Sequence, residues 1–473
     1  MTPSGKPAAP NSISALFTDL YELTMLQAYW DLGFTDKAAF SLFARRLPPE
    51  RNYLIACGLD GVIDALESLR FDSADIAYLS QLGAFSERTL ERLRGFRFTG
   101  DVYAMAEGTP FFPNEPILEI EAPIGEAQIV ETLVMNQIGL QTMLASKAAR
   151  VVEAARGRPV MDFGSRRAQG LDAALKGARA FHLAGVASTS NVMAGQVYGM
   201  PVSGTIAHSF IEACPSELEA FRAFVSIYPQ TTLLIDTYDT LQGARNVVKL
   251  AAKLGAEFRL RAVRLDSGDL SQLSRGVRDI LDGAGLNQVQ IVASGGLDEY
   301  KVDQLLAAKA PIDSFGVGTD MSISADAPAL DLVYKLTEYA NVGRMKLAAG
   351  KRTLPGRKQI FRALSEGVMT SDILARSFEL EAGVPLLECV MRNGRRLARA
   401  GTLSETRLYA REKISQLPAA LRSLRTAAEP YGVFVSPSLR AYEQEVSDAI
   451  AHQAGAHLSD ETSAHSKWQG ITQ

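Results

Sequence analysis

Residues 263–269 read Val-Arg-Leu-Asp-Ser-Gly-Asp, a short apolar run that ends in polar residues around a glycine. The same pattern follows twice more: 290–296 read Gln-Ile-Val-Ala-Ser-Gly-Gly, and 314–319 read Ser-Phe-Gly-Val-Gly-Thr. Glycine lets backbone N–H groups approach an anion closely, because it has no Cβ and tolerates positive φ. A helix that follows such a turn adds its unpaired N–H groups and its dipole. Three such turns on successive strands predict one crevice for a phosphorylated ligand.

Apolar runs of strand length alternate with helical patterns from about residue 159 to 320, as the βα repeats of a parallel barrel do. Helices are predicted over 241–254 and 297–308, where apolar residues recur at helical spacing. The seven predicted strands are 160–163, 181–184, 201–205, 233–236, 260–266, 289–294 and 312–317. A complete barrel of this kind has eight strands, so we predict an irregular or incomplete parallel α/β barrel. Its phosphate site is expected in the loops after the last strands.

The N-terminal part of the chain has a different pattern. A helix is predicted over 19–30, strands over 39–45, 100–106 and 116–121, and a long helix over 126–156 that leads into the barrel. The predicted organisation is a disordered N-terminus (1–12), an α+β domain (13–125), the barrel catalytic domain (126–343), a C-terminal segment completing the N-terminal layer (344–455) and a flexible tail (456–473). The fold class is therefore α/β, with the barrel packed against an α+β domain built from both chain ends.

The composition narrows the class of protein. The 473 residues are 47% hydrophobic and 22% charged, which is ordinary for a globular protein, and the formal net charge of −4 argues against nucleic acid as a partner. Three widely spaced cysteines form neither a disulfide framework nor a metal-binding pattern, which fits a reducing cytoplasm. The sequence has neither a signal peptide nor an apolar run of about 18 residues, so no membrane span is expected.

Five segments together resemble the nicotinate phosphoribosyltransferase family, and they occur in that family's order. The segments are 18–25 (Thr-Asp-Leu-Tyr-Glu-Leu-Thr-Met), 163–170 (Phe-Gly-Ser-Arg-Arg-Ala-Gln-Gly), 204–210 (Gly-Thr-Ile-Ala-His-Ser-Phe), 264–269 (Arg-Leu-Asp-Ser-Gly-Asp) and 315–319 (Phe-Gly-Val-Gly-Thr). The resemblance implies a type II phosphoribosyltransferase fold and a homodimer. It also implies that nicotinate and 5-phosphoribosyl 1-pyrophosphate give nicotinate mononucleotide and pyrophosphate, coupled to ATP hydrolysis, as the first step of NAD salvage from nicotinate.

His208 is the predicted site of ATP chemistry. A neutral imidazole is a nucleophile that can accept a phosphoryl group. The resemblance implies that His208 becomes a phosphohistidine, and a purely structural histidine is the alternative. The sequence contains no Gly-x-x-x-x-Gly-Lys-Ser/Thr loop, so ATP would share the phosphoribosyl pocket or use a site without a recognised motif.

Arg264 and Asp266 are two residues apart near the end of a predicted strand, so their side chains should point to the same side. An arginine fork matches a carboxylate, which suits the anionic nicotinate, and Asp266 could orient the ring or a ribose hydroxyl. A simple Arg–Asp ion pair is the alternative. The resemblance assigns Arg264 to the nicotinate site and places Asp266 among the catalytic residues.

The remaining substrate contacts also follow from the resemblance. Phe163 and Tyr21 should stack on the pyridine ring, with Tyr21 supplied by the partner subunit, and Thr205 should contact nicotinate. Core packing is the commoner role for such aromatic residues. The residues predicted to bind phosphoribosyl pyrophosphate are Arg166, Ser294, Gly295, Gly296, Gly316, Gly318 and Thr319.

Asp236 and Asp239 end another predicted strand and are candidate ligands for Mg²⁺. Phosphoribosyl transfer needs this cation to neutralise the departing pyrophosphate, and carboxylate oxygens suit it. Asp236 is the better candidate and is also counted among the catalytic residues, because helix N-capping explains Asp239 equally well.

Several other functions compete with this interpretation. Phosphoribosyltransferases that use nicotinamide carry an acidic residue where this chain has the uncharged stretch 188–191 (Ser-Thr-Ser-Asn), and a quinolinate-type enzyme would not need the His208 segment. A sugar-phosphate isomerase or aldolase would need a catalytic Lys or Glu at a strand end, and none is evident. A non-catalytic ligand-binding relative would be expected to have lost residues such as His208, Arg264 and Asp266, yet all three are present.

Overall fold

The structure is a computed structural model that describes residues 14–348, 353–398 and 401–468. The predicted disordered N-terminus at 1–12 lies outside the described residues. The predicted tail at 456–473 overlaps the last helix, α17 (Pro437–Trp468), and its final residues 469–473 are not described. Within the described ranges, no helix combines the length and the hydrophobicity that crossing a membrane requires.

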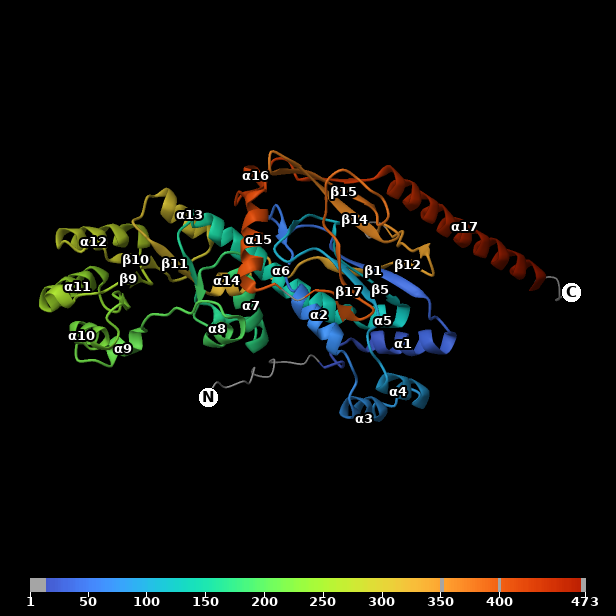
Figure 1. The fold of residues 1–473 in the computed structure, drawn as a ribbon, viewed down its shortest axis with the longest axis horizontal. Coiled ribbons are helices and arrows are strands. Elements are labelled where there is room, and N and C mark those ends of the chain that lie inside the picture. The colour runs from blue at the N-terminus through green and yellow to red at the C-terminus, as the bar shows by residue number, and fades with distance from the viewer. Residues whose placement is uncertain (1–13, 349–352, 399–400, 469–473) are drawn as a thin grey trace.

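The predicted barrel is present as an open sheet of parallel strands (Figure 1). In the described chain its order is β7-β6-β11-β10-β9-β8, so β6 returns beside β11 while β7 and β8 stay unpaired with each other. The strands are β6 (Val160–Asp162), β7 (Ser188–Thr189), β8 (Thr232–Leu234), β9 (Ala262–Leu265), β10 (Gln290–Ala293) and β11 (Ser314–Val317). The predicted irregular α/β barrel is confirmed.

Two of the predicted strands are wrong. Residues 181–184 form the end of helix α7 (Leu171–Leu183) and the residue after it. Every residue from Gly177 to Leu183 is buried, including Arg179 and His182, so this part of the helix has no polar face whose spacing would distinguish it from a strand. Residues 201–205 form only a single parallel bridge, between Val202 and Thr189. The polar strand β7 was not predicted, because two residues are too few to show a pattern.

Helices surround the parallel sheet, and several start at an aspartate that follows a strand. Asp239, Asp269 and Asp298 each accept a hydrogen bond from the backbone N–H three residues later, which caps the helix that follows. The barrel helices are α7, α8 (Val192–Tyr198), α9 (His208–Glu212), α10 (Glu217–Ile227), α11 (Thr240–Leu254), α12 (Leu270–Gly283), α13 (Glu299–Ala307) and α14 (Thr319–Ile323), with short 3-10 turns η1 (Ser165–Arg167) and η2 (Gly255–Glu257). These caps aim the strand-to-helix turns at one edge of the sheet.

The second domain is built from both ends of the chain, as predicted. Its larger sheet, within the described residues, has the order β13-β12-β1-β5-β3-β17-β18. The strands of this sheet are β1 (Lys37–Ala44), β3 (Asp101–Ala104), β5 (Pro116–Pro123), β12 (Leu332–Tyr339), β13 (Val342–Gly343), β17 (Glu388–Arg392) and β18 (Arg395–Arg396). Strands from before and after the barrel therefore share one sheet. The numerical domain boundaries remain a prediction.

Smaller elements complete this domain around the larger sheet. The remaining strands are β2 (Leu54–Ile55), β4 (Pro110–Phe111), β14 (Lys358–Ser365), β15 (Val368–Arg376), β16 (Val384–Pro385) and β19 (Gly432–Val435). The helices are α1 (Leu20–Leu32), α2 (Leu59–Ser68), α3 (Ser73–Gln81), α4 (Glu87–Arg94), α5 (Ile124–Ile129), α15 (Leu403–Ser415) and α16 (Ala419–Arg422). Helix α15 packs on α7, so the C-terminal part of the chain also contacts the barrel.

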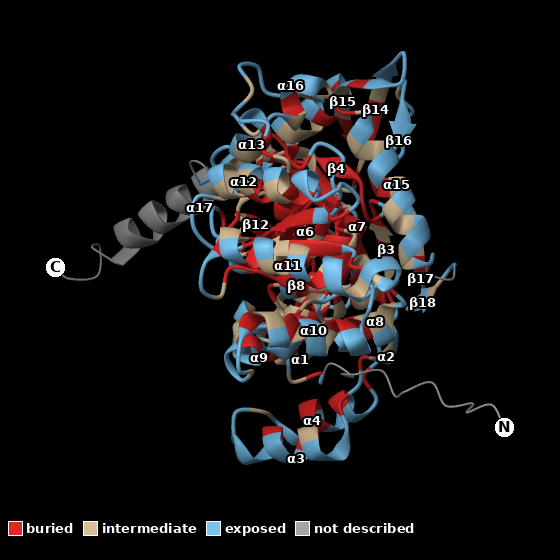
Figure 2. Cartoon of the chain, turned by 90° about the vertical axis from the view of Figure 1, so that its left-hand side faces the viewer, coloured by how far each residue is buried: buried red, intermediate tan, exposed pale blue. Residues whose placement is uncertain are grey.

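Helix α6 (Glu131–Ala154) connects the two domains and is largely buried. It contacts α7, α13 and α14 of the barrel and α2, β2 and β12 of the other domain. In Figure 2 the buried residues concentrate on α6 and the strands, whereas α11 and α12 expose their outer faces. A buried polar residue on α6 can therefore act on both domains at once.

Candidate active site

The carboxyl ends of β8, β9 and β10 are tied together by hydrogen bonds between polar side chains. Asp236 Oδ2, after β8, accepts from the Asp266 backbone N–H at 2.8 Å and from the Ser267 hydroxyl at 2.6 Å. Asp266 Oδ1 in turn accepts from the Ser294 hydroxyl, after β10, at 2.6 Å. These contacts bring three of the predicted segments to one edge of the sheet.

The glycines of this edge are required by close packing as well as by backbone conformation. Gly295 has φ +89°, and a Cβ there would lie 1.8 Å from the carbonyl oxygen of Asp266. A Cβ on Gly316 would lie 2.6 Å from the Phe163 ring and 3.2 Å from the Ser294 Cβ. Only glycine lets the strand ends approach so closely. The predicted phosphate turns are therefore neighbours, and the helices α13 and α14 begin directly after them.

Arg264 is a largely buried cation with a donor that has no partner among the described residues. Its side chain is 13% exposed, Nη2 donates to the Ile206 carbonyl at 3.2 Å, and its buried Nε has no hydrogen-bond partner in the described part of the chain. Asp266 Oδ1 is 4.0 Å from Nη1, too far for a hydrogen bond. Burial lowers the pKa of Arg264, against the opposing effect of the Asp266 and Asp236 charges. An anionic ligand is the natural partner for such a group.

Phe163 supplies an aromatic surface beside this arginine. The guanidinium carbon of Arg264 lies 5.9 Å from the centre of the Phe163 ring. The turn that carries Phe163 is held by the buried Asp162, whose carboxylate accepts from the Gly164 N–H at 2.8 Å and from the Thr189 hydroxyl at 2.7 Å. A flat aromatic acid could stack on the ring while its carboxylate meets the arginine.

His208 begins α9 and faces the same edge. Its Nδ1 lies 3.1 Å from the Thr237 hydroxyl, and its Nε2 lies 4.0 Å from Asp266 Oδ2. The side chain is 41% exposed, so a ligand can reach it. Because Nδ1 is engaged by Thr237, Nε2 is the nitrogen that is free to act as a nucleophile.

The two candidate metal ligands differ in their environment. Asp236 Oδ1 is buried and has no hydrogen-bond partner within the described ranges, although Oδ2 has two. Asp239 caps α11 through the Gln242 N–H at 2.6 Å, as the alternative interpretation had it. Among the described residues no group of three or more His, Cys, Asp or Glu side chains could hold a metal ion. Asp236 thus has a buried oxygen without a partner that is available for a cation.

Arg166 lies near this edge and Tyr21 does not, while Thr205 is next in sequence to Ile206, whose carbonyl accepts from Arg264. Arg166 is exposed in η1, and its charge also lowers the pKa of Arg264, which places the two cations in one electrostatic neighbourhood. Thr205 is half-buried and donates to the Ile206 carbonyl at 3.3 Å. Tyr21 is 45% exposed on α1, which lies in the other domain, well away from β9 and β10 (Figure 1). Within one chain Tyr21 does not join Phe163.

A cavity of about 1110 Å³ lies at the opposite, amino ends of the barrel strands. It touches Gly204 and Thr205, but its lining does not include His208, Arg264 or Asp266. We place the candidate active site at the carboxyl ends, because the unpartnered atoms of Arg264 and Asp236 and the close-packed glycines are there.

Three supporting residues were not singled out from the sequence: Asp162, Thr237 and Ser267. Each fixes a site residue, since Asp162 holds the Phe163 turn, Thr237 engages His208 and Ser267 binds Asp236. The available signal was their position, because each immediately precedes or follows a predicted site residue or strand end.

Comparison with known proteins agrees with this geometry. A model of the nicotinate phosphoribosyltransferase N-terminal domain matches residues 16–139, and a model of the nicotinate phosphoribosyltransferase family matches 159–382. The chain belongs to the nicotinate phosphoribosyltransferase family. These two family models thus cover the N-terminal part of the α+β layer and the barrel with its candidate site. The predicted resemblance is confirmed, while the roles of single site residues stay predictions.

Relatives within the nicotinate phosphoribosyltransferase family are similar over most of their length. The nicotinate phosphoribosyltransferase pncB2 of Mycobacterium tuberculosis is 56% identical over 425 residues, covering 90% of this chain and 92% of the relative. The Bacillus subtilis nicotinate phosphoribosyltransferase is 41% identical and covers 74% of each chain. The crystal structure of human nicotinic acid phosphoribosyltransferase matches with a TM-score of 0.81 at 29% identity, covering 91% of this chain and 99% of that one.

Proposed function

We propose that this protein transfers the phosphoribosyl group of 5-phosphoribosyl 1-pyrophosphate to nicotinate, giving nicotinate mononucleotide and pyrophosphate. The observation that carries the proposal is the buried Arg264, whose Nε lacks a partner, beside the face of Phe163 and at the same sheet edge as the glycine turns. A pyridine carboxylate fits Arg264 and Phe163, and phosphate groups fit the glycine turns. Membership of the family supports the same substrates.

The protein's part in this reaction is to position the reactants. The Arg264 fork would bind the nicotinate carboxylate and Phe163 would stack on its ring, with Thr205 at the rim, so that the pyridine nitrogen faces the anomeric carbon. That nitrogen forms the new bond to the anomeric carbon as the bond to pyrophosphate breaks, through an oxocarbenium-like state. Asp266 lies between the two substrates. Most of the rate enhancement is expected from orientation and charge stabilisation.

The phosphate groups would be bound by the glycine turns and by Arg166. The turn residues proposed to bind them are Ser294, Gly295, Gly296, Gly316, Gly318 and Thr319. Mg²⁺ bound with the substrate would neutralise the departing pyrophosphate. Asp236 Oδ1 fits a hard cation because it is buried without a partner, and substrate oxygens would complete the ligand set. Asp239 is the weaker ligand, since its carboxylate caps α11.

ATP hydrolysis is proposed to drive the synthesis through His208, which would place the enzyme in the ligase class. The γ-phosphoryl group of ATP would transfer to Nε2, because Thr237 engages Nδ1, and ADP would leave. Water would later cleave the phosphohistidine and release phosphate. The charge of a phosphorylated His208 beside Asp266 would change how the cleft binds the anionic substrates and products. This is the route by which hydrolysis could be coupled to synthesis.

A homodimer would complete the site with Tyr21 from the partner subunit. Tyr21 is exposed on α1 together with Leu20, and Leu171 and Val192 are exposed where α7 and α8 begin in the barrel. Exposed apolar side chains of this size on both domains suit an interface in which α1 of one subunit covers the barrel of the other. We also propose a cytoplasmic location, which agrees with the free thiols of all three cysteines.

The proposal is tested by measuring mononucleotide formation with nicotinate and with nicotinamide, each with and without ATP, in the presence of Mg²⁺. We expect product from nicotinate, formed faster with ATP. Equal or better turnover of nicotinamide would overturn the substrate assignment in favour of the nicotinamide-using alternative. No product from either pyridine would favour a non-catalytic ligand-binding relative.

His208→Ala tests the coupling separately. The variant should lose the stimulation by ATP, while it retains some ATP-independent synthesis. It should also take up no acid-labile phosphoryl group from labelled ATP. Continued stimulation by ATP in this variant would show that the phosphohistidine assignment is wrong.

A further inference from the structure

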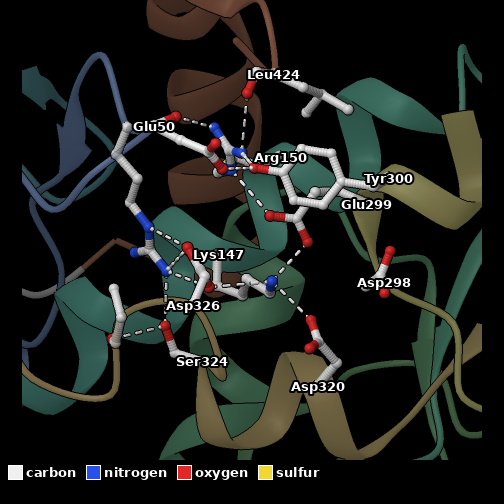
Figure 3. A network of polar contacts seen from close by, with 12 residues as sticks. Glu50, Lys147, Arg150, Asp298, Glu299, Tyr300, Asp320, Ser324, Asp326 and Leu424 are labelled. Carbon is white, nitrogen blue, oxygen red and sulfur yellow. Dashed lines mark hydrogen bonds and ion pairs between the residues drawn. The ribbon is translucent and has the colours of Figure 1, made fainter. Parts of the chain in front are cut away.

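Lys147 is a fully buried cation at the centre of a network of charges (Figure 3). It lies on α6 with 1% of its side chain exposed, and its Nζ contacts three carboxylates. The distances are 2.5 Å to Glu299 Oε2, 2.6 Å to Asp320 Oδ1 and 3.0 Å to Asp326 Oδ1. Although burial opposes the ammonium, the Glu299 charge and the Asp320 and Glu299 contacts raise the pKa of Lys147, so it stays charged.

Two of these carboxylates stand at the helix starts that follow the phosphate turns. Glu299 is the first residue of α13, which begins after the turn 294–296. Asp320 is the second residue of α14, which begins at Thr319, the last residue of the turn 316–319. Lys147 therefore joins the two helix starts through one nitrogen atom. In Figure 3 Glu299 and Asp320 approach the Lys147 nitrogen from different elements.

Glu299 and Asp326 each contact a second cation, whereas Asp320 contacts Lys147 as its only cation within the described residues. Arg150 Nε also binds Glu299 Oε1 at 2.9 Å, and Arg51 binds Asp326 through two contacts of 3.0 Å. In the described part of the chain Asp320 contacts Lys147 and no other cation, as an ion pair whose alignment is poor for a hydrogen bond. Three cations thus face three carboxylates, of which Glu299 is fully buried and Asp320 and Asp326 are partly exposed, at 26% and 21% of their side chains.

We propose that Lys147 is a positioning residue that holds the two phosphate turns at a fixed separation and so sets the affinity for phosphoribosyl pyrophosphate. This inference rests on the proposed function. With a side chain only 1% exposed, Lys147 cannot touch the substrate itself. It acts by fixing α13 and α14, whose N-termini and preceding turns face the phosphate groups. A buried ion network of this kind defines a geometry more than it adds stability.

Isosteric variants at the two helix starts test the proposal. Glu299→Gln and Asp320→Asn each remove one negative charge and preserve the side-chain volume. Glu299 is 0% exposed, so its replacement cannot remove a substrate contact. Each variant should raise the KM for phosphoribosyl pyrophosphate about tenfold or more, because a small misplacement of binding groups has effects of that size. The KM for nicotinate and the kcat at saturating phosphoribosyl pyrophosphate should change much less.

Asp303→Asn is the matched control. Asp303 is also on α13 and pairs with Arg156 at 2.5 Å, but both side chains are exposed, at 42% and 52%. This control should keep the wild-type KM for phosphoribosyl pyrophosphate. Thermal unfolding of all three variants would identify any loss of folded protein, and titration of the folded fraction with phosphoribosyl pyrophosphate and Mg²⁺ would give its dissociation constant directly.

The outcomes separate the inference from the proposed function. If the wild type forms mononucleotide and the Glu299 and Asp320 variants keep its KM and dissociation constant for phosphoribosyl pyrophosphate, the role of Lys147 is wrong and the enzyme assignment stands. If the two variants raise both pyridine and phosphoribosyl pyrophosphate KM values equally, the network has a general structural role and the inference is overturned. A wild type without activity or phosphoribosyl pyrophosphate binding would refute the proposed function itself.

Discussion

Replacing Gly295 by alanine should separate the ends of β9 and β10. Two costs follow from the structure: the backbone has φ +89°, and the added methyl group would stand 1.8 Å from the Asp266 carbonyl oxygen. Strain at such a φ costs about 1–3 kcal/mol, and relieving the overlap by a backbone shift costs about 1–3 kcal/mol more, so the expected loss is about 2–6 kcal/mol.

Gly296→Ala provides the matched comparison in the same turn. Its φ is +62°, and the nearest atom to an added methyl group would be Lys301 Nζ, at 3.9 Å. Only the left-handed conformation is then penalised, at about 1–2 kcal/mol. Because Asp266 also accepts the Ser294 hydroxyl, the shift forced by Gly295→Ala should raise the KM for phosphoribosyl pyrophosphate as well.

Urea denaturation of both variants gives the free energies of unfolding, and initial rates give the KM values. Gly295→Ala should lose more stability than Gly296→Ala by about 1–3 kcal/mol, the contribution of the overlap. Equal losses, or a larger loss at Gly296, would refute this prediction. So would a Gly295→Ala protein with unchanged stability and unchanged KM.

Three further predictions concern single contacts. Arg264→Lys should raise the KM for nicotinate about tenfold or more and leave that for phosphoribosyl pyrophosphate nearly unchanged in initial-rate assays, because the planar fork is lost. Thr237→Val should reduce the stimulation by ATP while ATP-independent synthesis persists, since it removes the hydroxyl beside His208 Nδ1. Burial and the nearby Arg407 lower the pKa of His182 from 6.5 to about 4. The unfolded chain therefore binds a proton first, and stability should fall as the pH drops from about 6.5 towards 4. Thermal unfolding of His182→Gln should lack this part of the pH dependence.

Much of the barrel could be predicted because its pattern is local. The strands near 263, 291 and 315 are short apolar runs with polar, glycine-containing ends, and each forms a strand at that place. The stretches at 181–184 and 201–205 were wrongly predicted as strands, because a helix buried on all sides shows no helical spacing of polar residues and a single bridge leaves no alternation.

The sequence predicted which residues belong to the candidate site, but not the contacts between them. Parallel strands present their carboxyl ends at one edge of a sheet, so Asp236, Asp266 and Ser294 were expected to be neighbours. Their hydrogen bonds to one another confirm the neighbourhood. The helix cap at Asp239 is a local contact with the Gln242 N–H and was one of the two roles predicted for that residue. The hydrogen bonds that join Asp236, Asp266 and Ser294 link residues about 30 positions apart, so they could not be derived from the local sequence.

The sequence alone determined the order of strands and turns and the glycines at their ends, because backbone conformation and strand patterning are properties of neighbouring residues. Only the tertiary structure decided which polar atoms are left without partners, Arg264 Nε and Asp236 Oδ1 among them. It also decided that Lys147 joins Glu299 to Asp320. The physical reason is that burial and ion pairing depend on distances between residues far apart in the chain, and folding alone sets those distances.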